Sequence, residues 1–256
     1  MVMATVTGTR RSKAPPAPNR FARASAGPRI GEGLIVDGND GVQRVRVGDM
    51  AEQEPFRILA VCTGNLVRSA LAEQLLTVRL GVLGSLIQVV SAGAAANPGD
   101  PMPEQAEELS RRYGGNPEGH RARLLSAELV GKADLILTAE RDHRAQVVSL
   151  VPRASRVTFT LNQFARLIES ITAEPTVPVA GGSVRELLVR VTEESASQRG
   201  YLPPLEDPAL DDVVDPYKQS QQFYDTAGRA VDAAVTTISA GLLRAVERGR
   251  GALGGA

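Results

Sequence analysis

The residues best suited to chemistry form one short stretch, Cys62-Thr63-Gly64-Asn65-Leu66-Val67-Arg68-Ser69, which holds the only cysteine of the chain. The stretch follows an apolar run and precedes an amphipathic one, so we expect a loop between a buried strand and a helix. Successive backbone N–H groups of such a loop point into one concavity, which suits an anion. The stretch therefore predicts an anion-binding loop with a thiol at its base.

Each polar residue of this loop has a role if the anion is a phosphate ester. The positive end of the following helix favours the thiolate form of Cys62, which is the nucleophilic form. Gly64 and Asn65 tolerate the left-handed backbone conformation that a nest of N–H groups requires. Arg68 returns over the loop, where its planar guanidinium can hold two phosphate oxygens. Ser69 is expected to donate a hydrogen bond to the thiolate and to assist its departure.

The bare spacing of Cys62 and Arg68 is a weak signal, because arginine is common in this chain. The plainer alternative is a small buried cysteine at a strand end and a solvated arginine on a helix. The context favours the anion loop, since a strand precedes it, Gly-Asn lies within it, and a serine and an amphipathic helix follow it.

The elements that must position this loop alternate between strands and helices. We predict strands at 57–61, 86–91, 134–138 and 157–159, and helices at 70–78, 104–113, 126–130, 140–150, 161–170, 184–193 and 220–247. This alternation implies an α/β fold, a four-stranded parallel sheet with helices on both faces, joined by right-handed crossovers. We predict one domain over residues 56–250, with an insertion or lid at about 171–212.

The N-terminal segment differs in composition from the rest of the chain. Residues 1–31 are rich in Arg, Pro, Ala, Ser and Gly and contain no acidic residue. We predict that residues 1–55 form a basic, disordered extension with a hairpin at 33–47. An Arg-rich transit peptide or a basic arm is the alternative, and translation from Met50 is another.

The whole-chain composition excludes several classes of function. No apolar run approaches the ~20 residues that span a bilayer, so we expect a cytoplasmic protein without membrane contact. The formal net charge is +0 and the chain has no Trp, which argues against nucleic acid as a partner. One cysteine and two histidines do not make a thiolate metal cluster, so we expect no metal and no cofactor.

The loop residues Cys62, Gly64, Asn65, Arg68 and Ser69 match the pattern Cys-x-x-Gly-Asn-x-x-Arg-Ser, and the chain here resembles the low molecular weight protein tyrosine phosphatases. Other stretches are similar to blocks of that family, namely Ala72-Glu73, Ser91-Ala92-Gly93, Gly119-His120-Arg121-Ala122-Arg123-Leu124, Ala133-Asp134-Leu135-Ile136-Leu137 and Asp215-Pro216-Tyr217. The likeness covers about 56–165 and 210–245. It implies the three-layer sandwich of the phosphotyrosine phosphatase I-like fold.

The resemblance also implies a set of roles. Cys62 would attack phosphorus to form a cysteinyl phosphate, while Arg68 and the backbone amides from Thr63 to Ser69, Leu66 and Val67 included, hold the oxygens. Asp215 would protonate the leaving oxygen and then act as base for water. Tyr217 would line the substrate cleft. The hydrogen-bond network that supports the loop would consist of Asn65, Ser69, Ser91 and His120.

Several of these residues have plainer alternatives. Asp215 ends an acidic run, and such runs are usually solvated surface. Tyr217 is alternatively a core aromatic, and His120 a structural or exposed histidine. His143 lies in a charged helical stretch, and we predict that it faces solvent.

Departures from the family pattern refine the expected function. Val67 and Ala70 stand where many relatives have a second cysteine and a proline, so oxidised Cys62 has no neighbouring thiol to trap it. Leu66 occupies a position that is bulky and aliphatic in the tyrosine phosphatases and threonine in the arginine phosphatases, which favours phosphotyrosine.

We therefore predict a cysteine-dependent phosphomonoesterase, a protein tyrosine phosphatase acting on phosphorylated protein. Two alternatives stay open. One is an arsenate reductase that uses an external thiol, because the chain lacks the extra cysteines of the thioredoxin-coupled route. The other is a family member that binds phosphate without catalysis.

Overall fold

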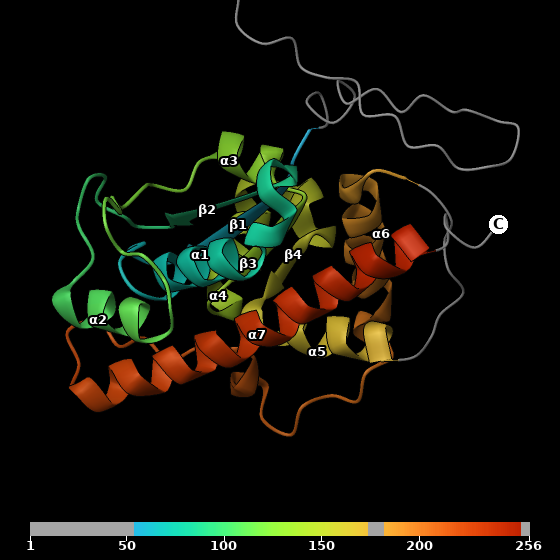
Figure 1. Cartoon of the computed structure of the whole chain (residues 1–256). Coiled ribbons are helices and arrows are strands. Elements are labelled where there is room, and N and C mark those ends of the chain that lie inside the picture. Colours follow the sequence, from blue (N-terminus) through green and yellow to red (C-terminus); the bar gives the residue numbers. More distant parts are fainter. Residues whose placement is uncertain (1–53, 174–181, 252–256) are drawn as a thin grey trace, which may run out of the picture. The chain divides into compact units, whose positions relative to one another are not determined.

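The computed structural model describes residues 54–173 and 182–251 of the chain (Figure 1). The hairpin predicted at 33–47, the alternative start at Met50 and all but the last two residues of the predicted extension lie outside these residues. Within the described ranges, no helix combines the length and apolarity needed to cross a membrane.

The sheet contains four parallel strands in the order β2-β1-β3-β4. They are β1 (Phe56–Cys62), β2 (Ile87–Gly93), β3 (Leu135–Thr138) and β4 (Thr158–Thr160). The four-stranded parallel sheet predicted from the alternation is confirmed. Because all strands run the same way, their carboxyl ends meet at one edge of the sheet, and β1 is flanked there by β2 and β3.

The sheet is covered on both faces, as the side chains of β1 show. Phe56, Ile58 and Ala60 pack into the larger core with the helices α1, α5, α6 and α7. Leu59 and Val61 point to the opposite face, into a second core with α3 and α4. Successive strand residues alternate between faces, so a central strand covered on both sides reads as a continuous apolar run.

The helices lie where the sequence predicts them, with ends that differ by a few residues. Their bounds are α1 (Arg68–Arg79), α2 (Glu104–Arg112), α3 (Ala127–Lys132), α4 (Arg141–Leu150), α5 (Leu161–Ala173), α6 (Val184–Ser197) and α7 (Gln221–Gly251). Short 3-10 turns connect some of them: η2 (Gly81–Leu86), η3 (Pro152–Arg156), η4 (Gln198–Gly200) and η5 (Pro208–Asp211). In Figure 1, α7 is the long red helix that runs past α1 and α5.

The described part of the predicted insertion is built on helix α6. Ser183 and Glu186 form a capping box at its start, with Ser183 Oγ accepting from Glu186 N and Glu186 accepting from Ser183 N. Val184 and Leu188 are buried in the larger core, so α6 is packed against the main domain. The chain then passes through η4 and η5 to the segment that carries Asp215.

Candidate active site

The predicted anion loop connects the end of β1 to the start of α1. Cys62 is the last residue of β1 and lies beside Gly93 of β2. Hydrogen bonds from Ala94 N to Cys62 O (2.8 Å) and from Ala95 N to Thr63 O (2.9 Å) continue the pairing into the loop. The loop therefore lies at the carboxyl edge of the sheet, where the predicted strand, loop and helix place it.

The base of the loop holds the thiol against a hydroxyl. Cys62 is buried, and its Sγ lies 2.9 Å from Ser69 Oγ. Asn65 has the predicted left-handed backbone, with φ 55°. Gly64 does not have a positive φ, so that part of the prediction is wrong. One left-handed residue is enough to turn this loop.

The side chain and backbone of Asn65 hold the loop in shape. Its Nδ2 donates to Ser69 Oγ (3.0 Å) and to Ser91 Oγ (2.7 Å), and its Oδ1 accepts from Arg123 N (2.8 Å). Its carbonyl oxygen lies 2.8 Å from His120 Nε2. These bonds satisfy a fully buried amide, and they bring together the residues expected to support the loop.

Glu73 completes this network and was not predicted as a site residue. It lies on α1, one turn after Ser69, and accepts a hydrogen bond from Ser91 Oγ. Its Oε2 is 3.9 Å from His120 Nδ1. The sequence feature that could have indicated Glu73 is its spacing of four residues from Ser69, because this spacing places both side chains on one helical face.

Gly93 allows the loop to lie close to β2. A Cβ at this position would stand 2.5 Å from Thr63 O and 2.6 Å from Asn65 N, and both are backbone atoms. We expect Gly93→Ala to displace the loop and to weaken phosphate binding about tenfold or more, since the N–H groups lose their alignment. Gly81→Ala is the matched control, because nothing lies within 4 Å of its Cβ. Calorimetric titration with phosphate measures the difference, and equal affinities in the two variants would contradict it.

Arg68 is 2% exposed and lies at the centre of the site's charges. Its Nη1 donates to a carboxylate oxygen of Glu140 and to Val213 O (2.9 Å). Its Nη2 lies 2.9 Å from Asp215 Oδ2 and 3.3 Å from Thr63 Oγ1. The fold thus brings Asp215 to the loop across a long stretch of sequence. Glu140 was not predicted as a site residue.

The segment around Asp215 is held by its acidic neighbours. Asp211 forms an ion pair with Arg166, and Asp212 accepts from the guanidinium and backbone N of Arg141. Ion pairing to α4 and α5 fixes this segment to the fold. The alternative of a solvated acidic run therefore does not describe Asp211 and Asp212.

A cavity of about 230 Å³ opens over the loop. Its lining residues are Cys62, Thr63, Gly64, Leu66, Val67, Arg68, Ala95, Asn97, Asp100, Asp215 and Tyr217. Tyr217 is 42% exposed at this cavity, so the alternative of a core aromatic is wrong. Ser69, Asn65, Ser91 and His120 do not line it and lie behind the loop. Ala95, Asn97 and Asp100 also line it and were not predicted.

His143 is buried, which corrects the prediction that it faces solvent. Its Nε2 lies 2.9 Å from Thr63 Oγ1, and its Nδ1 is 3.7 Å from Glu140 Oε2. The helix α4 begins at the carboxyl end of β3, next to β1, so its first turn faces the loop. Burial lowers the pKa of His143, and the charge of Arg68 lowers it further, while Glu140 opposes both.

This lowered pKa predicts a loss of stability on acidification. The unfolded chain takes up the His143 proton near its ordinary pKa of about 6.5, before the folded chain does. The free energy of unfolding should therefore fall as the pH decreases below about 6.5. Urea unfolding at pH 7.5 and 5.5 tests this, and His143→Gln should lose less stability between the two values. Equal losses in both proteins would refute the assignment.

Among the residues that the structure describes, no group of three or more His, Cys, Asp or Glu side chains is placed to hold a metal ion. The polar side chains that line the cavity are the Cys62 thiol, the Arg68 guanidinium, the carboxylates of Asp100 and Asp215, the Asn97 amide, and the hydroxyls of Thr63 and Tyr217.

The sequence and the fold of this chain are similar to those of known proteins. The sequence model of the family "Low molecular weight phosphotyrosine protein phosphatase" matches residues 57–183. Etp of Escherichia coli K12, a low molecular weight protein-tyrosine-phosphatase, is 36% identical over 115 residues, which are 45% of this chain and 75% of Etp. A protein-arginine-phosphatase of Geobacillus stearothermophilus is 34% identical over 121 residues, 47% of this chain and 79% of the relative.

Solved structures agree with the sequence relatives. The low molecular weight protein tyrosine phosphatase of T. tengcongensis has a TM-score of 0.51 at 26% identity, covering 72% of this chain and 97% of its own. The YwlE arginine phosphatase of G. stearothermophilus has a TM-score of 0.52 at 23% identity, covering 74% and 94%, and supports the fold. The predicted α/β fold and the predicted family are both confirmed. The chain belongs to the low molecular weight phosphotyrosine protein phosphatase family.

Proposed function

We propose that this protein hydrolyses phosphomonoesters on proteins, with Cys62 as nucleophile, Arg68 as phosphate ligand and Asp215 as general acid. The observation that carries the proposal is that all three side chains line the same cavity, in which Arg68 Nη2 lies 2.9 Å from Asp215 Oδ2. A nucleophile, a phosphate ligand and an acid within one cavity are the groups that such a reaction needs.

The reaction has two balanced steps. In the first, Cys62 Sγ forms a bond to phosphorus, the phosphorus–oxygen bond to the leaving group breaks, and the leaving oxygen takes the proton of Asp215. In the second, the Asp215 carboxylate takes a proton from a water molecule while the oxygen of that water bonds to phosphorus. The phosphorus–sulfur bond breaks, and inorganic phosphate and the Cys62 thiolate are released. Ser69 Oγ, 2.9 Å from Sγ, stabilises the departing thiolate.

The walls of the cavity favour phosphotyrosine as the substrate. Leu66 and Tyr217 present an aliphatic and an aromatic surface beside the loop, and an aryl ring packs well between such surfaces. The relatives include both tyrosine and arginine phosphatases, so phosphotyrosine and phosphoarginine are the two substrates to compare.

Two peptides that differ only in the phosphorylated residue, phosphotyrosine or phosphoarginine, test this substrate. With chelator present, we expect kcat/KM to be at least about tenfold higher for phosphotyrosine, because only its aryl ring packs against Tyr217 and Leu66. A preference for phosphoarginine would assign the protein to the other substrate. Loss of activity on adding chelator would contradict the metal-independent mechanism.

The same preparation separates the remaining alternatives. Arsenate-dependent consumption of an added thiol would indicate a reductase, which the relatives do not favour. Binding of phosphate or vanadate without any hydrolysis would indicate a non-catalytic member. We further propose residues 56–250 as the phosphatase domain and about 171–212 as an insertion in it.

A further inference from the structure

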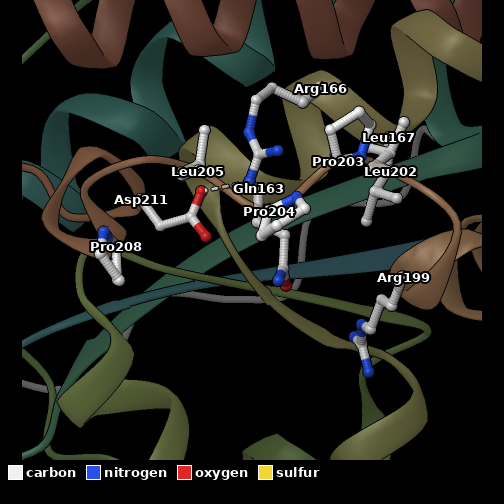
Figure 2. Close-up of a pocket in the computed structure, with 10 residues that line it drawn as sticks. All are labelled: Gln163, Arg166, Leu167, Arg199, Leu202, Pro203, Pro204, Leu205, Pro208 and Asp211. Atoms are coloured by element: carbon white, nitrogen blue, oxygen red, sulfur yellow. Dashed lines mark hydrogen bonds and ion pairs between the residues drawn. The ribbon is translucent and has the colours of Figure 1, made fainter.

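A second cavity, of about 250 Å³, shares no lining residue with the first. It lies between α5, the turn η4 and the loop that follows, and Figure 2 shows its lining. Its apolar walls come from Leu167 and from the Leu and Pro residues of the segment 202–208. Its polar groups are Gln163, Arg166, Arg199 and Asp211.

These polar groups carry one positive charge in excess. Arg166 Nη2 forms an ion pair with Asp211 Oδ1 at 2.7 Å, drawn as the dashed line in Figure 2, so these two charges cancel. Within residues 54–173 and 182–251, Arg199 donates to two carbonyl oxygens, those of Ser155 (2.9 Å) and Thr158 (2.6 Å). No carboxylate of the described residues pairs with it.

The surroundings of Arg199 make its unbalanced positive charge energetically unfavourable. Its guanidinium stacks on the Phe159 ring at 3.8 Å, and Arg144 donates to the same Thr158 oxygen at 3.1 Å. Burial and the neighbouring charge of Arg144 lower the pKa of Arg199 to about 10. A guanidinium that is partly desolvated beside a second guanidinium gains most from a bound anion.

We propose that this cavity is a binding site for a small organic carboxylate, with Arg199 holding the carboxylate and the Leu and Pro walls holding its apolar body. A monoanion matches the excess of one charge. The volume exceeds the ~150 Å³ of an apolar cavity that holds benzene, so it is large enough for a benzoate-sized molecule. Gln163 adds a polar group to the same lining.

The site is joined to the catalytic cavity by consecutive residues. Asp211 lines the second cavity, and Asp212 accepts from Arg141 at the start of α4. Val213 N then donates to Ala139 O, and Val213 O accepts from Arg68. Asp211 and Asp215 therefore lie in one segment, which lines the second cavity at one end and the catalytic cavity at the other.

Backbone amide NMR of the full chain tests the proposal, with vanadate present to saturate the Cys62 loop. Benzoate is the probe, and benzamide, which has the same shape without charge, is its control. We expect benzoate to shift the amides between 202 and 213, and benzamide to bind about tenfold more weakly or worse. Arg199→Met should weaken benzoate about tenfold or more. Arg156→Met removes an exposed arginine outside the cavity and should leave benzoate binding unchanged.

Three results would overturn the site: equal binding of benzamide, unchanged benzoate affinity in Arg199→Met, or benzoate binding that appears only when vanadate is left out. Thermal unfolding checks that Arg199→Met is folded. If it is not, Leu205→Glu in the loop provides the second test, because a carboxylate in the cavity wall should repel benzoate. Unchanged affinity in that variant would equally exclude the site. These outcomes do not depend on whether the protein hydrolyses phosphate esters.

Discussion

Cys62→Ser is expected to abolish hydrolysis of 4-nitrophenyl phosphate, by on the order of 10⁴-fold or more, while the loop still binds phosphate. A serine hydroxyl stays protonated at neutral pH. Ser69 Oγ, 2.9 Å from Cys62 Sγ, is itself a hydroxyl and is not a base that could remove this proton. Arg68 and the loop backbone are unchanged, so the anion site survives. Release of nitrophenol measures turnover, and calorimetric titration measures phosphate binding.

Turnover and phosphate binding of Cys62→Ser together decide the role of Cys62. Lost turnover with retained phosphate binding assigns the nucleophile to Cys62. Turnover within about tenfold of the parent would mean that another group attacks phosphorus, or that water attacks directly, and the cysteinyl phosphate would have to be abandoned. Loss of both, with a lowered melting temperature, would mean that the serine disturbed the loop, and Cys62→Ala would then be the variant to measure.

Asp215→Asn is expected to slow hydrolysis of phenyl phosphate by about 10²- to 10⁴-fold, with a smaller effect on 4-nitrophenyl phosphate. Phenolate is a poor leaving group and needs the proton, whereas nitrophenolate leaves readily without it. Asparagine keeps the shape of the side chain and an oxygen for Arg68 Nη2, which lies 2.9 Å from Asp215 Oδ2. The ratio of the two effects therefore reports on proton transfer.

Asp207→Asn is the matched control for the charge. Asp207 is exposed and its Oδ1 accepts from Ala209 N at 2.8 Å, a cap that asparagine replaces well. We expect this variant to hydrolyse both esters at the parent rate. Equal slowing of the two esters by Asp215→Asn would limit Asp215 to holding Arg68, and it would remove the general acid from the mechanism.

Local sequence was enough to predict the loop and its framework. Cys62, Asn65, Arg68 and Ser69 lie within one short stretch, and strand and helix periodicity around them sets where the stretch begins and ends. The apolar run of β1 also indicated a strand buried on both faces. The two faces were then found occupied by separate cores.

The charged partners of the loop were harder to predict, because their positions depend on strand order. Glu140 and His143 lie at the start of α4, in a stretch that looks like a solvated helix. They face the loop because β3 is the neighbour of β1, and the sequence does not specify that neighbour. Burial then lowers the pKa of His143 beside Arg68, which no helical pattern can indicate.

By itself, the sequence determined the α/β class, the nucleophile loop and the family of this protein, since each is encoded in residues that are close along the chain. Only the tertiary structure decided which distant charges complete the site. Glu140 and Asp215 come from separate segments and meet at Arg68, held there by Val213 and by ion pairs to α4 and α5. Such contacts arise from the packing of whole elements, so spacing along the chain carries little trace of them.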